Sequence, residues 1–184
     1  MAPGGSVNAR IKYFFVGSYV ATYAFAFAGG IAAAVLGEID RDLEIVGTVI
    51  LLPALPAMIG WFGCALWWVY DAWSSIPEEH REAPLVGRVT PAVAVVLFFV
   101  PCFNAFRIFA CNIGIANSIN SASLTRGSRE QVPVVVPVLA ACLHFVPYCN
   151  LLLGPVAWAA FMWMADKARA DLGRVDADAI AQVF

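Results

Sequence analysis

The stretch FVPCFN at Phe99–Asn104 recurs as FVPYCN at Phe145–Asn150, so a very apolar chain twice places a proline three residues before an asparagine. The likeness extends upstream. PAVAVVLFFVPCFN (Pro91–Asn104) aligns with PVLAACLHFVPYCN (Pro137–Asn150) at an offset of 46 residues, with seven of fourteen positions identical. Chance matches of Ala, Val and Leu are common in apolar sequence, whereas the repeated prolines and asparagine are not. The pattern therefore predicts an internal structural repeat.

The shared residues predict a broken helix in each copy. The leading proline suits the first turn of a helix, where its missing N–H costs nothing, and Thr90 precedes the first copy as an N-cap. Pro101 and Pro147 each remove a helical hydrogen bond, and in lipid the freed carbonyl needs a partner nearby. Asn104 and Asn150 offer two donors and an acceptor, which can cap the broken turn or reach another helix.

The two copies admit two interpretations. If each copy crosses a membrane once, they run in opposite directions, and two discontinuous helices meet near mid-membrane, as in transporter binding sites. The other interpretation is a pair of proline kinks whose asparagines lock the packing of neighbouring helices, and we favour this one.

The composition places this chain in a membrane. Of 184 residues, 61% are hydrophobic and 13% charged, with a mean hydropathy of +0.78, against about 45–50% and about 25% in soluble domains. The formal net charge of −2 offers no basic stripe for phosphates, so no nucleic-acid partner is expected. The five cysteines all lie inside apolar stretches, where cysteine behaves as a small hydrophobe.

Four stretches are long enough to span a bilayer, which needs about 20 apolar residues. They predict an all-α, integral membrane four-helix bundle (residues 1–166) with proline-broken third and fourth spans, whose spans cover about residues 13–36, 45–70, 90–115 and 132–164. Pro53 and Pro56 predict a bend in the second span. The small residues of AFAFAGGIAAA (Ala24–Ala34) suit close packing of the first span on a neighbour. Residues 167–184 are predicted to form a cytoplasmic amphipathic tail.

Lys and Arg predict the orientation, because they accumulate on the cytoplasmic side. A cytoplasmic N-terminus places seven of them inside (Arg10, Lys12, Arg81, Arg88, Lys167, Arg169 and Arg174) and three outside (Arg41, Arg126 and Arg129). We therefore expect a multi-pass protein of the bacterial inner membrane with both termini cytoplasmic. Aromatic anchors are expected at the inner interface (Tyr13, Trp67, Trp68, Trp73 and Trp163).

The segment WWVYDAW (Trp67–Trp73), followed after a polar loop by TPAVAVVLFFVPCFN, resembles an uncharacterised bacterial four-helix membrane family, a domain of unknown function with a Phe-x-Pro-x-x-Asn motif. The resemblance covers about residues 67–120. Asp71 stands where the family has a basic residue, and the proline expected after Asn104 is absent. The resemblance implies a topology and no chemistry.

Arg107 and His144 are the residues most out of place. An arginine in a span costs about 2.5–3.5 kcal/mol on insertion scales, so Arg107 either reaches the outer interface or binds an anion, lipid phosphate or carboxylate. His144 is interpreted as a hydrogen-bonded core histidine, because its spacing to the cysteines fits no zinc pattern. No catalytic residue, metal or cofactor is predicted, and Glu78–Glu82 is expected to form a solvated face or a short interfacial helix.

Two functions from different classes follow. The first is a non-enzymatic structural or accessory subunit of a homo-oligomer or larger membrane complex, partnered by the bilayer and by other membrane subunits. The alternative is a small oligomeric channel or transporter for an ion or small anionic solute, lined by Asn104, Asn150 and Arg107.

Overall fold

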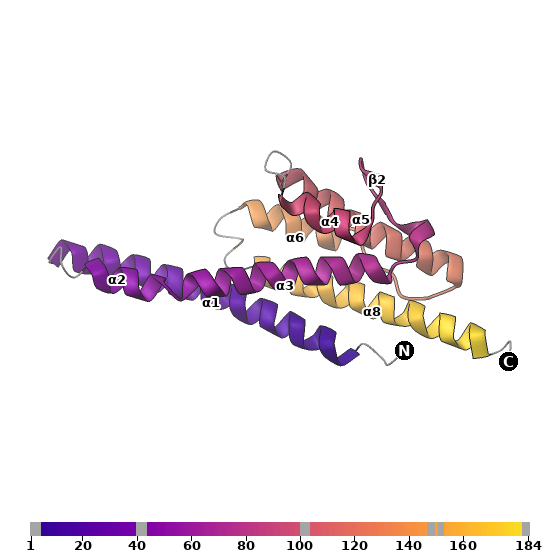
Figure 1. Cartoon of the computed structure of the whole chain (residues 1–184), viewed down its shortest axis with the longest axis horizontal. Helices are drawn as coiled ribbons and strands as arrows, with labels where there is room; N and C mark the ends of the chain where they lie inside the picture. Colours follow the sequence, from indigo (N-terminus) through magenta and orange to yellow (C-terminus); the bar gives the residue numbers. More distant parts are fainter. Residues whose placement is uncertain (1–4, 40–43, 100–103, 147–149, 151–152, 182–184) are drawn as a thin grey trace. The chain divides into compact units, whose positions relative to one another are not determined.

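The computed structural model describes residues 5–39, 44–99, 104–146, 150 and 153–181. Within them the chain is almost entirely helical, as the sequence predicts (Figure 1). By contact it divides into two compact units: unit 1 comprises Met1–Asn8 and Leu66–Phe184, and unit 2 comprises Ala9–Ala65. Two segments of the described chain, Arg10–Ile39 and Ile45–Ser75, are long and apolar enough to cross a membrane.

Unit 2 pairs most of helix α1 (Gly5–Ile39) with α2 (Glu44–Leu51) and the start of α3 (Ala54–Ser75). The helices approach closely at glycine. A Cβ atom on Gly47 would lie 2.3 Å from the backbone nitrogen of Ala33, and one on Gly29 would lie 2.9 Å from the Gly47 carbonyl. The small-residue stretch of the first span therefore does pack tightly against a neighbour, as predicted.

Aromatic rings hold the other end of unit 2 together. Phe15 and Tyr19 of α1 are buried, and the Trp61 ring lies 6.3 Å and 5.2 Å from their centroids. Such pairs add to the burial of apolar area because ring edges and faces carry opposite partial charge.

The bend predicted from the prolines of the second span lies at Pro53. Helix α2 ends at Leu51 and α3 begins at Ala54, and proline cannot donate the hydrogen bond that would continue the helix. Pro56 falls in the first turn of α3, where no such bond is required.

Between α3 and the next helix, unit 1 contains a short helical turn, one of the two predicted alternatives, and a pair of strands that the sequence did not predict. Glu78–His80 forms a single 3₁₀ turn (η2), and two short antiparallel strands follow, β1 (Glu82–Ala83) and β2 (Gly87–Arg88). Leu85 and Gly87 adopt positive φ, which closes the turn. None of Glu78–Glu82 is buried, and η2 is compatible with the short helix that was one of the two predictions for this segment; Ala83, which follows it, is buried against Gly114.

The first repeat begins as predicted, with a short capped helix. Thr90 caps α4 (Pro91–Val96) by accepting from the Val93 N–H, and Pro91 occupies the first helical position. A 3₁₀ turn, η3 (Leu97–Phe99), follows, and α5 runs from Asn104 to Arg126. The third span was predicted to be broken at Pro101, and separate helices do lie on either side of residues 100–103, which fall outside the described residues.

Residues 117–126 lie between the third and fourth predicted spans, where a polar connecting loop is expected, and instead they continue helix α5. Their polar side chains misled the prediction because several face the protein: Ser118 and Ser123 are buried, alongside Ile119 and Ala122. Ser118 is satisfied because it pairs with both backbone groups of Glu82, whereas Ser123 Oγ is buried without a hydrogen bond to any described residue.

The second repeat forms α6 (Val135–Phe145), followed by the long helix α8 (Gly154–Ala181). Pro137 lies in the first turn of α6 rather than at its first position. The predicted tail boundary at residue 166 falls inside α8, and Ala168 and Leu172 of the predicted tail are buried in unit 1. The tail residues up to Ala181 therefore extend a helix of the core unit.

Helices α5, α6 and α8 form the core of unit 1 together with the end of α3 (Figure 1). Helices α5 and α6 are antiparallel, because Phe109 stacks on Phe145 at 5.9 Å while Asn120 bonds the backbone of Val132. Two of the expected interfacial anchors, Trp68 and Trp73, are instead buried in this core; Trp67 and Trp163 are exposed.

Candidate functional site

One end of unit 1 carries a set of ion pairs and hydrogen bonds that we call the polar collar. It draws on α3, η2, α5, the segment that follows α5, and α8. Its members are Trp68, Asp71, Glu79, His80, Ser121, Arg126, Ser128, Glu130, Asp166, Lys167, Arg169, Asp171, Arg174 and Asp176.

The most buried part of the collar surrounds Arg169. Its guanidinium contacts Asp71 at 2.5 Å and Asp166 at 3.3 Å, and Trp68 Nε1 donates to Asp166 at 3.1 Å. The Arg169 and Asp166 side chains are each 10% exposed. Because Arg169 pairs with Asp71 of α3 and with Asp166 of its own helix α8, removing either carboxylate would leave a buried cation with less compensating charge, and the cluster ties α3 to α8.

Asp171 forms a second anchor. Its carboxylate accepts from Ser128 Oγ at 2.6 Å and from the Arg129 N–H at 3.2 Å, and pairs with Arg174. The Ser128 hydrogen bond, together with the backbone N–H groups of Glu130 and Arg129 and the Arg174 charge, holds the pKa of Asp171 below its usual value. These bonds fix the segment after α5 against α8.

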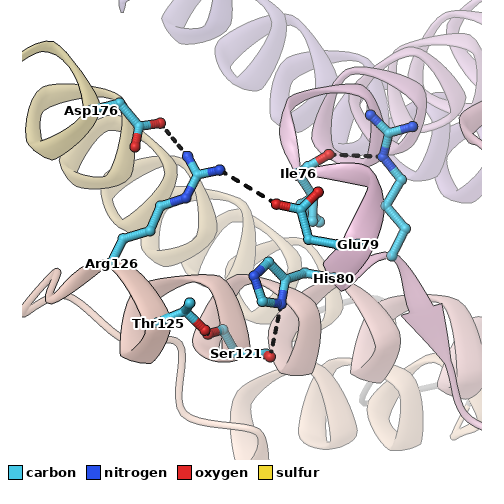
Figure 2. Close-up of polar contacts among 8 residues, drawn as sticks. Ile76, Glu79, His80, Ser121, Thr125, Arg126 and Asp176 are labelled. Atoms are coloured by element: carbon cyan, nitrogen blue, oxygen red, sulfur yellow. Dashed lines mark hydrogen bonds and ion pairs between the residues drawn. The ribbon is translucent and has the colours of Figure 1, made fainter. Parts of the chain in front are cut away.

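Arg126 joins three segments, as Figure 2 shows. It pairs with Asp176 of α8 and lies 3.7 Å from the Glu79 carboxylate of η2. Lys167 adds a further pair with Glu130 at 2.8 Å. Nearby, Arg81 donates to the carbonyls of Ile76 and Ser74 and so caps the end of α3.

A polar cleft of about 350 Å³ opens beside η2 and α5, lined by Glu79, His80, Glu82, Asn117, Ser118 and Ser121. His80 Nδ1 lies 3.1 Å from Ser121 Oγ (Figure 2). A hydroxyl beside an imidazole is the pairing that activates a serine nucleophile, but this pair is open to water. In the part of the chain that is described, no three His, Cys, Asp or Glu side chains gather to hold a metal ion.

The residues predicted from the repeat lie at the opposite end of α5 and α6. Asn104 begins α5 and Arg107 lies in its first turn, but both side chains fall outside the described structure, as do Pro101 and Pro147. Asn150 is buried; its side chain bonds the His144 ring, and its N–H donates to the Val146 carbonyl at 2.7 Å. His144 and Asn150 are therefore brought together by the structure, as packing residues.

Sequence reasoning missed the polar collar. Two of its pairs, Asp166 with Arg169 and Asp171 with Arg174, have the i,i+3 spacing of helix neighbours and could have been found. The contacts of Arg126, Ser128 and Glu130 with α8 could not, because they join residues more than 35 positions apart.

Comparison with known protein families, with curated proteins and with solved structures found no match to this chain.

Proposed function

We propose that this protein is a non-enzymatic structural or accessory subunit of the bacterial inner membrane, anchored by two full spans and by two re-entrant helical hairpins. The spans are α1 and the bent pair α2–α3. The hairpins are α4–η3 with the first half of α5, and α6 with the first half of α8. In this arrangement the third and fourth predicted spans enter the membrane and return to the same side.

The polar collar carries this proposal. Four spans would put residues 117–130 outside and residues 71–88 and 167–176 inside. Yet Arg126 pairs with Glu79 and Asp176, Lys167 pairs with Glu130, and Ser128 bonds Asp171. Because no such contacts can form across a bilayer, the segments on either side of each hairpin belong on one face.

Charge distribution supports the same topology. With two spans, nine of the 11 Lys and Arg residues fall on the side of both termini (Arg10, Lys12, Arg81, Arg88, Arg126, Arg129, Lys167, Arg169 and Arg174). Only Arg41 falls on the other side, and Arg107 lies within a hairpin. This asymmetry is stronger than the seven against three of the four-span topology, and it makes the collar side cytoplasmic.

The proposal of a non-enzymatic role is based on how the charged side chains of the collar are bonded. The charged side chains of the collar are engaged with one another and join helices. The channel alternative gains no support from Asn150, because its side chain is buried and bonded to His144.

Purification in a mild detergent tests the proposed role. We expect the full-length chain to elute as a homo-oligomer or with companion membrane proteins, detected by light scattering and mass spectrometry. A lone monomer without companions, recovered at every detergent concentration that keeps the chain folded, would contradict the role of a subunit.

A further inference from the structure

We infer that unit 1 is a one-leaflet wedge: its two hairpins displace acyl chains of the cytoplasmic leaflet alone, so the protein favours membrane in which that leaflet is the convex one. This inference rests on the proposed topology and adds a lipid partner, the hydrocarbon of one leaflet.

The length of the hairpin arms sets their depth. Residues Pro91–Phe99 of α4 and η3 number nine, and α6 has 11 residues. At 1.5 Å per residue these arms reach about 14–17 Å, roughly half of a hydrocarbon core about 30 Å thick. The returning arm of α8 has no charged residue between Gly154 and Asp166. This uncharged stretch is similar in length to the other arms, so it reaches a similar depth.

The surface of the arms is suited to acyl chains. Large apolar side chains project from all four arms without cover from unit 1, at Val93, Val96, Phe99, Phe106, Leu139, Phe145, Leu153 and Val156. The exposure of Val96 is 61%, and that of Val156 is 65%. Trp163 and Trp67 are exposed close in sequence to Asp166 and Asp71 of the collar, where an interfacial belt of aromatic residues is expected.

The two hairpins are packed together, so they insert as one body. Phe109 of α5 stacks on Phe145 of α6 near the tips, Ala140 and Ala141 of α6 are fully buried, and α6 contacts both α5 and α8. The collar then holds the opposite ends. Four helical arms, each about 10 Å across, occupy about 300 Å² of one leaflet. A body of this size in one leaflet is expected to make membrane binding sensitive to curvature, as it is for interfacial helices.

The test uses the orientation of the full-length chain in vesicles of two sizes. All five native cysteines are replaced by alanine, and a fluorophore is attached at Glu78→Cys or, separately, at Leu124→Cys. An impermeant quencher then reports the fraction of molecules whose collar faces outward. In small sonicated vesicles the outer leaflet is strongly convex, so we expect the outward-to-inward ratio to rise relative to large extruded vesicles.

Matched variants distinguish an effect of the hairpin arms on orientation from an effect of the size of the polar collar. Val96→Asp and Leu139→Asp each place a charge on one hairpin arm. In both variants the increase of the outward-to-inward ratio in small vesicles should be smaller, as measured with the fluorophore at Glu78→Cys. Leu124→Asp changes a side chain of similar exposure, 71%, on the collar half of α5 and should preserve it. A folded chain is confirmed for each by its thermal unfolding in detergent.

The outcomes are distinct. Equal ratios in small and large vesicles, with both labels quenched to the same extent, would overturn the wedge and leave the topology intact. A rise that persists undiminished in both arm variants would also overturn it. Labels at residues 78 and 124 that report opposite sides would overturn the proposed topology and the wedge with it.

Discussion

At the scale of single residues, the structure depends on polar side chains buried within helices. Asn112, Ser118, Ser123 and Asp171 are all buried in unit 1, although each residue type normally lies at a surface. Ser118 and Asp171 meet backbone groups or charges from segments distant in sequence. Burial of Ser118 and Asp171 is tolerated because these partners replace the hydrogen bonds that water would provide, whereas Ser123 Oγ and Asn112 Oδ1 are buried without a hydrogen bond within the described part of the chain.

Asp171 gives a prediction about pH. Because its pKa is lowered in the folded protein, it stabilises the fold above the usual carboxylate pKa of about 3.9, and the contribution is lost as the pH falls through the lowered value. Ser128→Ala removes the first cause of the lowering. We expect this variant to unfold at a lower temperature than the wild type at neutral pH, with a difference that shrinks as the pH falls below about 4.

Thermal unfolding in detergent across this pH range measures the difference. Ser75→Ala is the control, because Ser75 Oγ donates to the Ala72 carbonyl, which does not titrate, so the effect of this substitution should be the same at neutral pH and near pH 4. A Ser128→Ala deficit that is the same at all pH values would show that its bond to Asp171 does not matter.

At the scale of elements, proline, glycine and caps determine where helices begin, bend and approach. The bend at Pro53 and the Thr90–Pro91 start of α4 follow from local chemistry and were predicted from sequence. The length of α5 was not, because local polarity suggested a loop where tertiary partners stabilise a helix.

Gly47 gives a prediction about the helix pair of unit 2. Gly47→Ala would place its Cβ 2.3 Å from the Ala33 backbone, so α1 and α2 must separate. We expect a loss of about 1–3 kcal/mol in the free energy of unfolding, as for other overpacked sites. Gly63→Ala meets no atom within 4 Å and should be neutral or stabilising by up to about 1 kcal/mol.

Unfolding of both glycine variants in the same detergent distinguishes these expectations. If Gly47→Ala were as stable as Gly63→Ala, the close approach of α1 and α2 would not contribute to stability.

At the scale of the whole molecule, the polar collar distinguishes between two membrane topologies that the same hydropathy profile allows. Four apolar stretches are compatible with four crossings or with two crossings and two hairpins. Contacts among residues 71–88, 117–130 and 166–176 favour the second.

Cysteine labelling in spheroplasts tests the threading. In the cysteine-free chain, Ile39→Cys should react with an impermeant maleimide from outside, because it lies at the end of the first span. Glu78→Cys and Leu124→Cys should react only after the membrane is opened. Labelling of Leu124→Cys from outside would restore the four-span topology.

The sequence by itself determined that this chain is helical and apolar enough to enter a membrane, where its second span bends, and where α4 starts, because these depend on composition and on neighbouring residues. Only the tertiary structure decided that residues 117–126 are helical, that His144 and Asn150 pair, and that the polar segments gather at one end. Those features depend on contacts between residues far apart in sequence, such as Arg126 with Asp176, and no local pattern encodes which distant partner a charge or hydroxyl will meet.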